Sequence, residues 1–230
     1  MLICYVCVTT SEIGKVWTYG EEALEPSVTR KKTYDLLMNK ALVLFEQGEI
    51  PSISRLATEA GVSRATAYRY FPTQSDLIAA AVGASLETIR EWKPKSDDKV
   101  GERIAELFDF AFPEMFRHEG ALRAALLVSL QQWALERHSP DKMEKKLVRG
   151  NRKATLARVM EPVKEKYSPE MYRKVIAAFS LLYGSEVFLV MKDIWGMDNQ
   201  EVIDNVQWMA KAIINQANRE SSEEEYASNK

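Results

Sequence analysis

Signals for the start of a helix recur along this chain, whereas β-strand patterns are nearly absent after residue 28. Five polar residues each precede a helical pattern of apolar residues: Ser63, Thr73, Ser139, Ser168 and Asp198. A short polar side chain at this position accepts hydrogen bonds from the free backbone N–H groups of the first helical turn. Pro140 and Pro169 stand in the first turn of two of these helices, where a missing N–H group does no harm. The sequence therefore predicts an all-α fold.

The apolar periodicity and the capping residues together predict nine helices. They span about residues 29–47, 53–60, 64–70, 74–92, 98–117, 120–137, 140–166, 169–195 and 199–219. Thr73 with Asp76, and Asp198 with Glu201, resemble capping boxes, in which the two residues satisfy each other's backbone N–H groups. The starts of these two helices are therefore the best defined.

The length of 230 residues suits a small domain followed by a larger one. The polar segment Lys93–Asp98 contains a proline and marks the expected boundary between them. We therefore expect a small helical domain at residues 29–92 and a larger one at 98–219. Residues 1–28 form an arm of unknown structure, and the acidic residues 220–230 are typical of a disordered tail.

The composition excludes a disordered or collagen-like chain, because 46% of the residues are apolar and only 10 are Gly and 8 are Pro. The densest apolar run, Ala177–Met191, contains Glu186 and is shorter than the roughly 18–20 residues that cross a bilayer. We expect no membrane partner and, without a secretory signal at the N-terminus, a cytoplasmic location. Cys4 and Cys7 are interpreted as ordinary apolar residues, so neither a metal nor another cofactor is expected.

One segment, SISRLATEAGVSRATAYRYFPTQSDL at residues 52–77, carries the information about function. Leu56 and Ala57 fall on one helical face, Gly61 supplies a tight turn, and Ser63 caps a second short helix. This is the pattern of a helix-turn-helix. In such a unit the second helix enters the major groove of DNA, and polar residues around it hold phosphates.

The same segment resembles the tetracycline-repressor (TetR) family of transcription regulators. The resemblance covers about residues 29–80, and the rest of the chain agrees only in being helical and of suitable length. The positions that carry it are Leu56-Ala57, Ala60-Gly61-Val62-Ser63, Thr66, Tyr68, Tyr70-Phe71 and Leu77. The resemblance implies a DNA-binding domain at residues 29–92 and a C-terminal domain at 98–219 that binds a ligand and dimerises.

The resemblance also implies roles for individual residues. Arg64, Ala65 and Thr66 would lie at the groove-facing start of the recognition helix, with Arg64 reading a guanine edge. The other residues expected at the DNA are Thr29, Arg30, Lys31, Ser63, Tyr68, Arg69, Tyr70, Thr73 and Gln74. The family usually has Lys where this chain has Gln74, which leaves that phosphate contact in question. Tyr68 and Tyr70 could instead be core aromatics, and Phe71 is assigned to the core.

The C-terminal helices carry two sets of expected contacts. The helix at 169–195 is apolar all round its axis from Ala177 to Met191, so one side needs a partner. The resembled family dimerises through its last two helices. The expected interface residues are Leu182, Leu189, Ile203, Val206, Ala210, Ile213 and Ala217. The family encloses a small-molecule inducer in this domain, and the expected ligand contacts are Phe112, Phe116, Leu130, Trp133, Phe179, Tyr183 and Glu186. A plain apolar core, and for Glu186 a pair with a basic side chain at the dimer interface, are the alternatives.

The sequence therefore predicts a DNA-binding transcriptional regulator, a repressor that a small-molecule effector releases. Its expected partners are double-stranded DNA with an inverted-repeat operator, a second copy of the chain and an effector of unknown identity. An all-α adaptor that uses the helix-turn-helix for protein contacts is an alternative. An enzyme is disfavoured, because the chain has no HExxH, no phosphate-binding loop and only two His.

Overall fold

The computed structural model describes residues 28–96, 99–138 and 152–228, and side chains as far as residue 223. Those residues form helices without a β-strand, which confirms the all-α prediction. In chain order the elements are α2 (Val28–Glu46), α3 (Ile53–Glu59), α4 (Arg64–Tyr70), α5 (Gln74–Ser85), α6 (Glu87–Glu91), α7 (Val100–Arg117), α8 (Glu119–His138), α9 (Arg152–Val159), η2 (Glu161–Val163), α10 (Pro169–Leu182), α11 (Glu186–Phe188), η3 (Leu189–Ile194) and α12 (Asn199–Ser228). The expected arm with Cys4 and Cys7 lies outside the described residues.

The chain divides after Leu36 into two units. The described part of the first unit is the beginning of α2, where the Thr33 hydroxyl donates to the Thr29 carbonyl at 3.0 Å. The second unit holds every later element, and the arrangement below concerns this unit alone. The domain boundary expected at Lys93–Asp98 stays a prediction.

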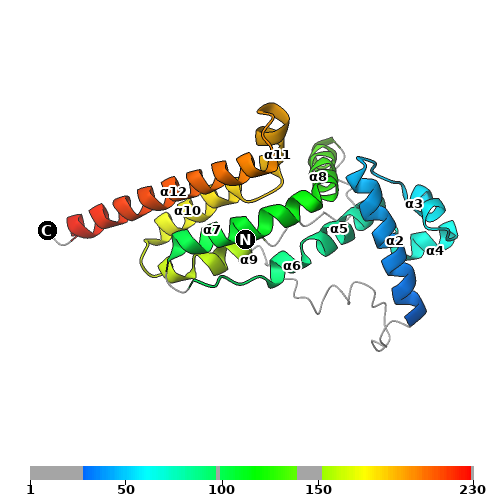
Figure 1. The fold of residues 1–230 in the computed structure, drawn as a ribbon, viewed down its shortest axis with the longest axis horizontal. Helices are drawn as coiled ribbons and strands as arrows, with labels where there is room; N and C mark the ends of the chain where they lie inside the picture. Colours follow the sequence, from blue (N-terminus) through cyan, green and yellow to red (C-terminus); the bar gives the residue numbers. More distant parts are fainter. Residues whose placement is uncertain (1–27, 97–98, 139–151, 229–230) are drawn as a thin grey trace. The chain divides into compact units, whose positions relative to one another are not determined.

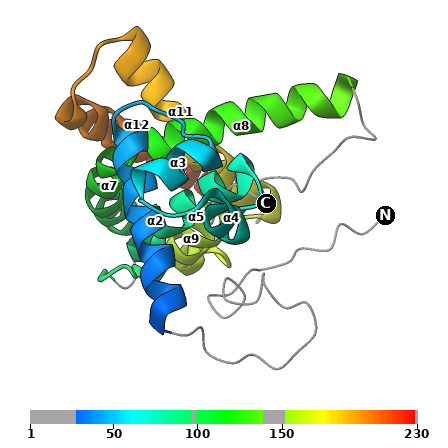
Figure 2. The same cartoon turned by 90° about the vertical axis from the view of Figure 1, so that its right-hand side faces the viewer.

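The elements nearest the predicted helix-turn-helix form one group within the second unit. The buried residues of α2 recur at helical spacing, at Leu37, Ala41 and Leu44, and the helix is followed by Gly48 at φ 80°. α3 and α4 pack against each other, as Figure 2 shows, and α5 packs on α8. Only the first half of α8 is buried; its buried residues are Ala121, Leu122, Ala124, Ala125, Leu126 and Val128.

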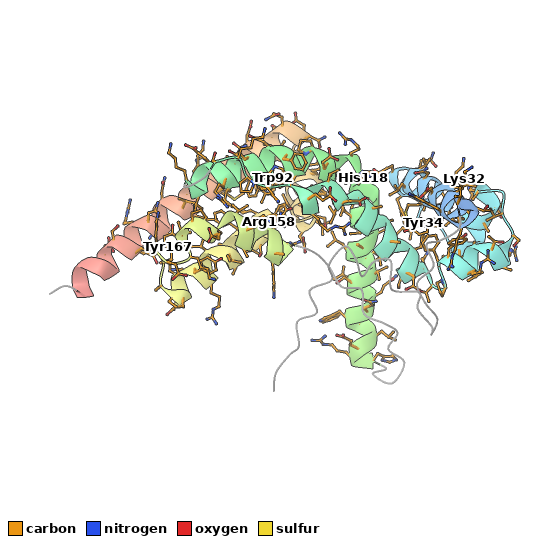
Figure 3. The ribbon with its side chains drawn as sticks, turned by 90° about the horizontal axis from the view of Figure 1, so that it is seen from below. Lys32, Tyr34, Trp92, His118, Arg158 and Tyr167 are labelled. Atoms are coloured by element: carbon orange, nitrogen blue, oxygen red, sulfur yellow. The ribbon has the colours of Figure 1, made fainter. Side chains whose placement is uncertain are left out.

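A large buried cluster joins α7, α9, α10, α11 and α12. Its biggest fully buried side chains are Phe108, Phe112, Phe179 and Phe188. α12 packs along α7 and α10 (Figure 1). Near the start of α10, the Tyr167 hydroxyl (Figure 3) donates to Asn218 Oδ1 at 2.7 Å, and Lys174 Nζ lies 2.9 Å from Glu220 Oε2. The beginning of α10 thus meets the far part of α12, so the two helices are antiparallel.

The helix predicted at residues 74–92 is interrupted at Leu86, between α5 and α6. The preceding residue, Ser85, is buried, and its hydroxyl donates to the Ala81 carbonyl at 2.8 Å. A serine that bonds back to its own helix in this way bends the helix. The end of α6 is then held by Arg158, whose Nη1 donates to the Trp92 carbonyl at 2.5 Å (Figure 3). A cation at a helix C-terminus is favoured by the helix dipole.

The helix predicted at 169–195 ends instead at Leu182. Arg152 of α9 reaches into this break, where its Nη1 donates to the Ser180 carbonyl at 2.8 Å and its Nη2 to Glu186 Oε2 at 2.5 Å. A Cβ on Gly184 would lie 1.9 Å from Arg152 Nη2, so a side chain there would displace the guanidinium group from its present position. No single described helix has the length and apolar character to cross a membrane; α10 together with Glu186–Ile194 meets that test only as a pair bent by 58°.

α12 corrects the prediction for the C-terminal end. The helix continues to Ser228, so the prediction of disorder is wrong for residues 220–228. Both capping interactions predicted at its start are present, because Asp198 Oδ1 accepts from the Glu201 N–H at 2.9 Å and Glu201 Oε2 accepts from the Asp198 N–H at 2.8 Å. Towards its end, Glu220 pairs with Lys174 and accepts from Gln216 Nε2 at 2.8 Å. These side-chain contacts stabilise the end of α12, where the acidic residues by themselves predict a solvated and disordered segment.

The first turn of α8 lies directly on the end of α2. A Cβ on Gly120 would stand 2.0 Å from the Phe45 carbonyl oxygen and 2.4 Å from the Phe45 carbonyl carbon. Real Cβ contacts of this length do not occur, and the obstructing atoms are backbone rather than the end of a flexible side chain. Only glycine allows the two helices to approach this closely.

The charged side chains beside Gly120 face the opposite way, towards η3. Arg123 binds Asp193 with two parallel hydrogen bonds of 2.6 and 2.7 Å and also donates to Glu119 at 2.8 Å. Lys192 Nζ lies 2.5 Å from Glu119 Oε2 and donates to Asn199 Oδ1 at 3.0 Å. The hydrogen bonds from Arg123 hold the pKa of Asp193 below its ordinary value. The first turn of α8 thus binds α2 on one side and η3 on the other.

Replacing Gly120 with alanine should destabilise the protein by about 1–3 kcal/mol, because the added methyl group forces the α2 and α8 backbones apart. Chemical denaturation followed by circular dichroism measures the change. Gly101→Ala is the matched control: it also lies in a first helical turn, but no atom stands within 4 Å of the added Cβ. That variant should be neutral or more stable, since alanine favours a helix. Equal stability of the two variants would contradict the close approach.

Candidate nucleic-acid interface

The turn between α3 and α4 has the geometry that the sequence predicted. The Ser52 side chain caps α3 by accepting from the Arg55 N–H at 3.1 Å. Gly61 follows α3 with φ at +66°, in the left-handed region that disfavours side chains. The Val62 N–H returns to the Ala57 carbonyl at 3.0 Å, which closes the turn. The glycine therefore sets the direction in which α4 leaves α3.

α4 has two clearly different faces. Ala67 is buried, and so is Phe71 directly after the helix, as the sequence predicted. The opposite face exposes Arg64, Ala65, Tyr68 and Arg69, which follow one another at i, i+1, i+4 and i+5. Tyr68 leaves 46% of its surface exposed, which contradicts the alternative that it is a core aromatic. Two arginines, a small methyl group and a phenol hydroxyl therefore share one exposed surface, which we call the α4 face.

The charge of the α4 face is positive without compensation inside the helix. The helix sequence, RATAYRY, contains no acidic residue. The acids nearest along the chain are Glu59 of α3, which pairs with Arg55, and Asp76 of α5, which accepts from the Thr73 N–H. A polyanion approaching α4 thus meets two arginines, while the neighbouring carboxylates are already paired.

Ser63 and Thr66 are engaged within the chain. Ser63 Oγ accepts from the Thr66 N–H at 3.1 Å and lies 2.8 Å from Thr66 Oγ1. Both residues had been assigned to DNA contacts, and Ser63 also acts here as the predicted helix cap. Ser63 thus satisfies a backbone N–H group in the first turn of α4, which is the end of the helix that would approach DNA.

Tyr70 is the one predicted DNA contact on α4 that the structure places elsewhere. Only 7% of its surface is exposed, on the same side of the helix as Ala67. The spacing explains the difference, because residue 70 lies three positions beyond the buried Ala67 and therefore returns to the same face. The alternative reading of Tyr70 as a core aromatic is correct.

The start of α5 contains the two remaining predicted contacts, Thr73 and Gln74. Thr73 forms the predicted capping box with Asp76: its hydroxyl accepts from the Asp76 N–H at 3.1 Å, and its own N–H donates to Asp76 Oδ2 at 3.2 Å. Gln74 Nε2 donates to the Ile50 carbonyl at 3.2 Å and to the Pro51 carbonyl at 3.0 Å. Both side chains thus have partners inside the chain.

The first unit carries three further predicted contacts, Thr29, Arg30 and Lys31. All three are exposed on the first turn of α2. A helix N-terminus is a favourable place for a phosphate, because its free N–H groups and the helix dipole both attract anions.

The predicted dimer interface is wrong for three of its residues. Val206, Ala210 and Ala217 are buried on the face of α12 that packs against α7 and α10 of the same chain. Of the other four, Leu182, Ile203 and Ile213 are partly buried against the core, and Leu189 is exposed. The periodicity found a buried face but could not tell which chain buries it.

Sequence analysis missed two large apolar side chains on the surfaces of the same helices. Leu181 of α10 leaves 77% of its surface exposed and Trp208 of α12 leaves 70%. Leu181 lies next to the end of α10 and Trp208 is followed by the apolar Met209 and Ala210, so the apolar pattern alone did not show that either side chain is exposed. Exposed apolar groups of this size are typical of surfaces that a partner covers.

The predicted ligand contacts fall into two sets. Phe112, Phe179 and Tyr183 belong to the buried cluster, and Phe116 packs against it with its ring centroid 5.7 Å from that of Phe112. Burial raises the pKa of Tyr183 to about 12, so this phenol stays neutral at physiological pH. Glu186 pairs with a basic side chain, as the alternative expected, but the partner is Arg152 of the same chain and not a residue at a dimer interface.

Leu130 and Trp133 are separate from that cluster. Both lie on the second half of α8, and Trp133 leaves 55% of its surface exposed, with the Arg137 guanidinium 4.2 Å from its ring centroid. The buried face of α8 ends at Val128, where the helix passes beyond α5. Among the residues described, no three His, Cys, Asp or Glu side chains gather as a metal site.

Comparison with known proteins agrees with this geometry. Residues 37–81, which include all of α3 and α4, match the family described as "Bacterial regulatory proteins, tetR family". A tetR-family transcriptional regulator from Streptomyces coelicolor is 20% identical, with 84% of this chain and 85% of that one covered and a TM-score of 0.61. A TetR transcriptional regulator from Rhodococcus sp. RHA1 is 13% identical, with 80% and 96% covered and a TM-score of 0.51. No curated protein matches the sequence.

Proposed function

We propose that this chain, a TetR-family DNA-binding transcriptional regulator, is a cytoplasmic homodimeric repressor that reads an inverted-repeat operator. The observation that carries the proposal is the α4 face, which exposes Arg64, Ala65, Tyr68 and Arg69 on a helix without acidic residues. A short helix of this kind fits the major groove, where arginine binds guanine and a methyl group contacts thymine. Regulators of this family are not enzymes, and the proposal includes no catalytic step.

Each residue of the interface has a distinct proposed role. Arg64 reads a guanine edge, because it begins the exposed face of α4 and its planar guanidinium can donate two hydrogen bonds to one base. Tyr68 and Arg69 bind phosphates on either side of the groove. Thr29, Arg30 and Lys31, exposed at the start of α2, are proposed to bind a further phosphate. Ser63 and Thr66 act mainly by capping α4.

The proposed dimer forms through the outer surfaces of α10 and α12. Leu181 and Trp208 lie on these two antiparallel helices and are largely exposed within one chain. A two-fold pair of such surfaces would bury four large apolar groups and form a four-helix interface. Because a two-fold dimer presents two identical recognition helices, its operator would be an inverted repeat with half-sites about 34 Å apart.

The proposed release mechanism is a shift between two conformations of the dimer. An apolar or aromatic small molecule would bind among the buried rings of α7 and α10, which include Phe112, Phe179 and Tyr183. If the small molecule favours the conformation that fits the operator less well, it lowers the affinity of the protein for DNA. DNA then lowers the affinity of the protein for the small molecule by the same factor. The exposure of Leu130 and Trp133 favours the buried rings over α8 as the ligand site.

Arg64→Ala should relax base preference in each half-site and weaken specific binding by about 1–3 kcal/mol per lost bidentate contact. Tyr68→Phe removes an uncharged donor, so it should weaken binding to specific and random duplexes alike without changing the salt dependence. Fluorescence anisotropy at several salt concentrations measures both effects, with the operator obtained by selection from random duplexes.

Arg117→Ala, an exposed arginine of α7, is the control for the lost charge and should bind DNA as the wild type does. If neither substitution on α4 altered binding to any duplex, the adaptor function would be favoured over DNA binding. A selected site without inverted symmetry would contradict the two-fold arrangement.

Leu181→Glu and Trp208→Glu should each convert the dimer to a folded monomer, because a charge would have to be buried without a partner in the interface. Sedimentation at micromolar concentration measures the state, and circular dichroism verifies the fold. Leu130→Glu places the same charge at an exposed apolar residue of α8 and should leave the dimer intact. Dimers in both interface variants would show that another surface joins the chains.

An effector of the proposed kind should raise the melting temperature of the free protein and lower its DNA affinity. A panel of apolar aromatic compounds, screened by thermal shift, identifies it. Tyr183→Phe should change the response because it removes the hydroxyl group among the rings, whereas Trp133→Ala should not. The opposite pattern would place the ligand along the exposed half of α8.

A further inference from the structure

Gln74 joins two segments that are far apart in the sequence. Its side-chain nitrogen donates to the carbonyl oxygens of Ile50 and Pro51, at 3.2 and 3.0 Å. Both carbonyls precede α3, whose own hydrogen-bond ladder begins with the carbonyl of Ser52. They therefore have no partner within that helix. The hydrogen bond to Ile50 is exposed, whereas the one to Pro51 is partly buried, where a carbonyl without a partner is costly. We call these two hydrogen bonds the Gln74 bridge.

The bridge closes the helix-turn-helix at its base. The chain leaves the bridge at Pro51, forms α3 and α4, and returns through Thr73 to Gln74, the first residue of α5. The capping box of Thr73 and Asp76 fixes the backbone next to Gln74. Pro51 is buried, which fixes the other end. The two ends of the segment that carries the α4 face are thus bonded directly to each other.

We infer that Gln74 is a positioning residue that sets the orientation of α3 and α4 on α5, in place of the phosphate contact made by the basic residue that resembling sequences carry there. A primary amide suits this role, because it is neutral and planar and can donate two hydrogen bonds to adjacent carbonyls. Its consequence for DNA rests on the proposed function; its consequence for the free protein does not.

The positioning role differs from a phosphate contact in its effect on specificity. A residue that holds a phosphate contributes equally to specific and random duplexes. A residue that orients the recognition helix contributes mainly to the affinity for the specific duplex, because contacts with base edges depend on placement to a fraction of an ångström. The ratio of the two affinities therefore separates the two roles.

The first test uses the free protein and requires no DNA. Gln74→Ala should accelerate amide hydrogen exchange in residues 50–59 about tenfold, since two hydrogen bonds that close this segment are lost. Exchange in α10 and α12 should not change. Gln131→Ala is the matched control, because Gln131 is an exposed glutamine of α8, and it should leave exchange in residues 50–59 unchanged. Unaltered exchange in Gln74→Ala would overturn the inference, whatever the protein does with DNA.

The second test compares a selected operator with a random duplex. Gln74→Ala should weaken operator binding about tenfold and random binding less than twofold. Gln74→Lys adds a cation, so the affinity for a random duplex should rise. The slope of log K against log salt concentration should steepen by about one per half-site. The ratio of operator affinity to random affinity should fall. If Gln74→Lys instead tightened both equally and Gln74→Ala weakened both equally, Gln74 would be a phosphate contact. Absence of DNA binding by the wild type would refute the proposed function but not the result of the exchange experiment.

Discussion

The structure depends on one close approach of two backbones, where Gly120 of α8 lies on the Phe45 carbonyl at the end of α2. This contact joins α2, which precedes the helix-turn-helix, to the beginning of α8. Because the obstructing atoms are backbone, the approach depends on the absence of a single Cβ. The residues beside this contact are small as well: Ala121, Ala124 and Ala125 are buried, and their short side chains let this face of α8 pack closely against its neighbours.

Charged side chains have different roles in the C-terminal helices and in α4. In the C-terminal helices, arginines and lysines are mostly used internally, as with Arg123 on Asp193 and Arg152 on Glu186. The two hydrogen bonds from Arg123 to Asp193 fix the relative direction of α8 and η3, because bidentate geometry tolerates little rotation. On α4 the arginines remain exposed and no acid is present in the helix. A positive surface confined to α4 is therefore compatible with a net charge of −2 overall.

Local signals predicted the helix-turn-helix segment well and the later helices less well. Ser63, Thr73 and Asp198 cap helices as expected, because capping depends only on residues within one turn. The breaks at Ser85 and Gly184 were not predicted, since both depend on contacts with distant residues or on burial. Tyr70 was misassigned for a related reason. A tyrosine can pack in a core or donate a hydrogen bond to a phosphate, and the packing of the helix determines which of these two roles it has.

The sequence by itself determined that the chain is all-α, where its short helices begin, and that residues 52–77 form a helix-turn-helix, because caps, turn glycines and helical periodicity act over a few residues. Tertiary structure alone decided which side of α12 is internal, that Leu181 and Trp208 remain exposed, and that Gln74 binds the Ile50 and Pro51 carbonyls rather than standing free. A pattern of apolar residues shows that a face is buried but not by what, and a side-chain amide shows that it can donate but not to which acceptor. Both answers require the distances between residues that the chain brings together from far apart.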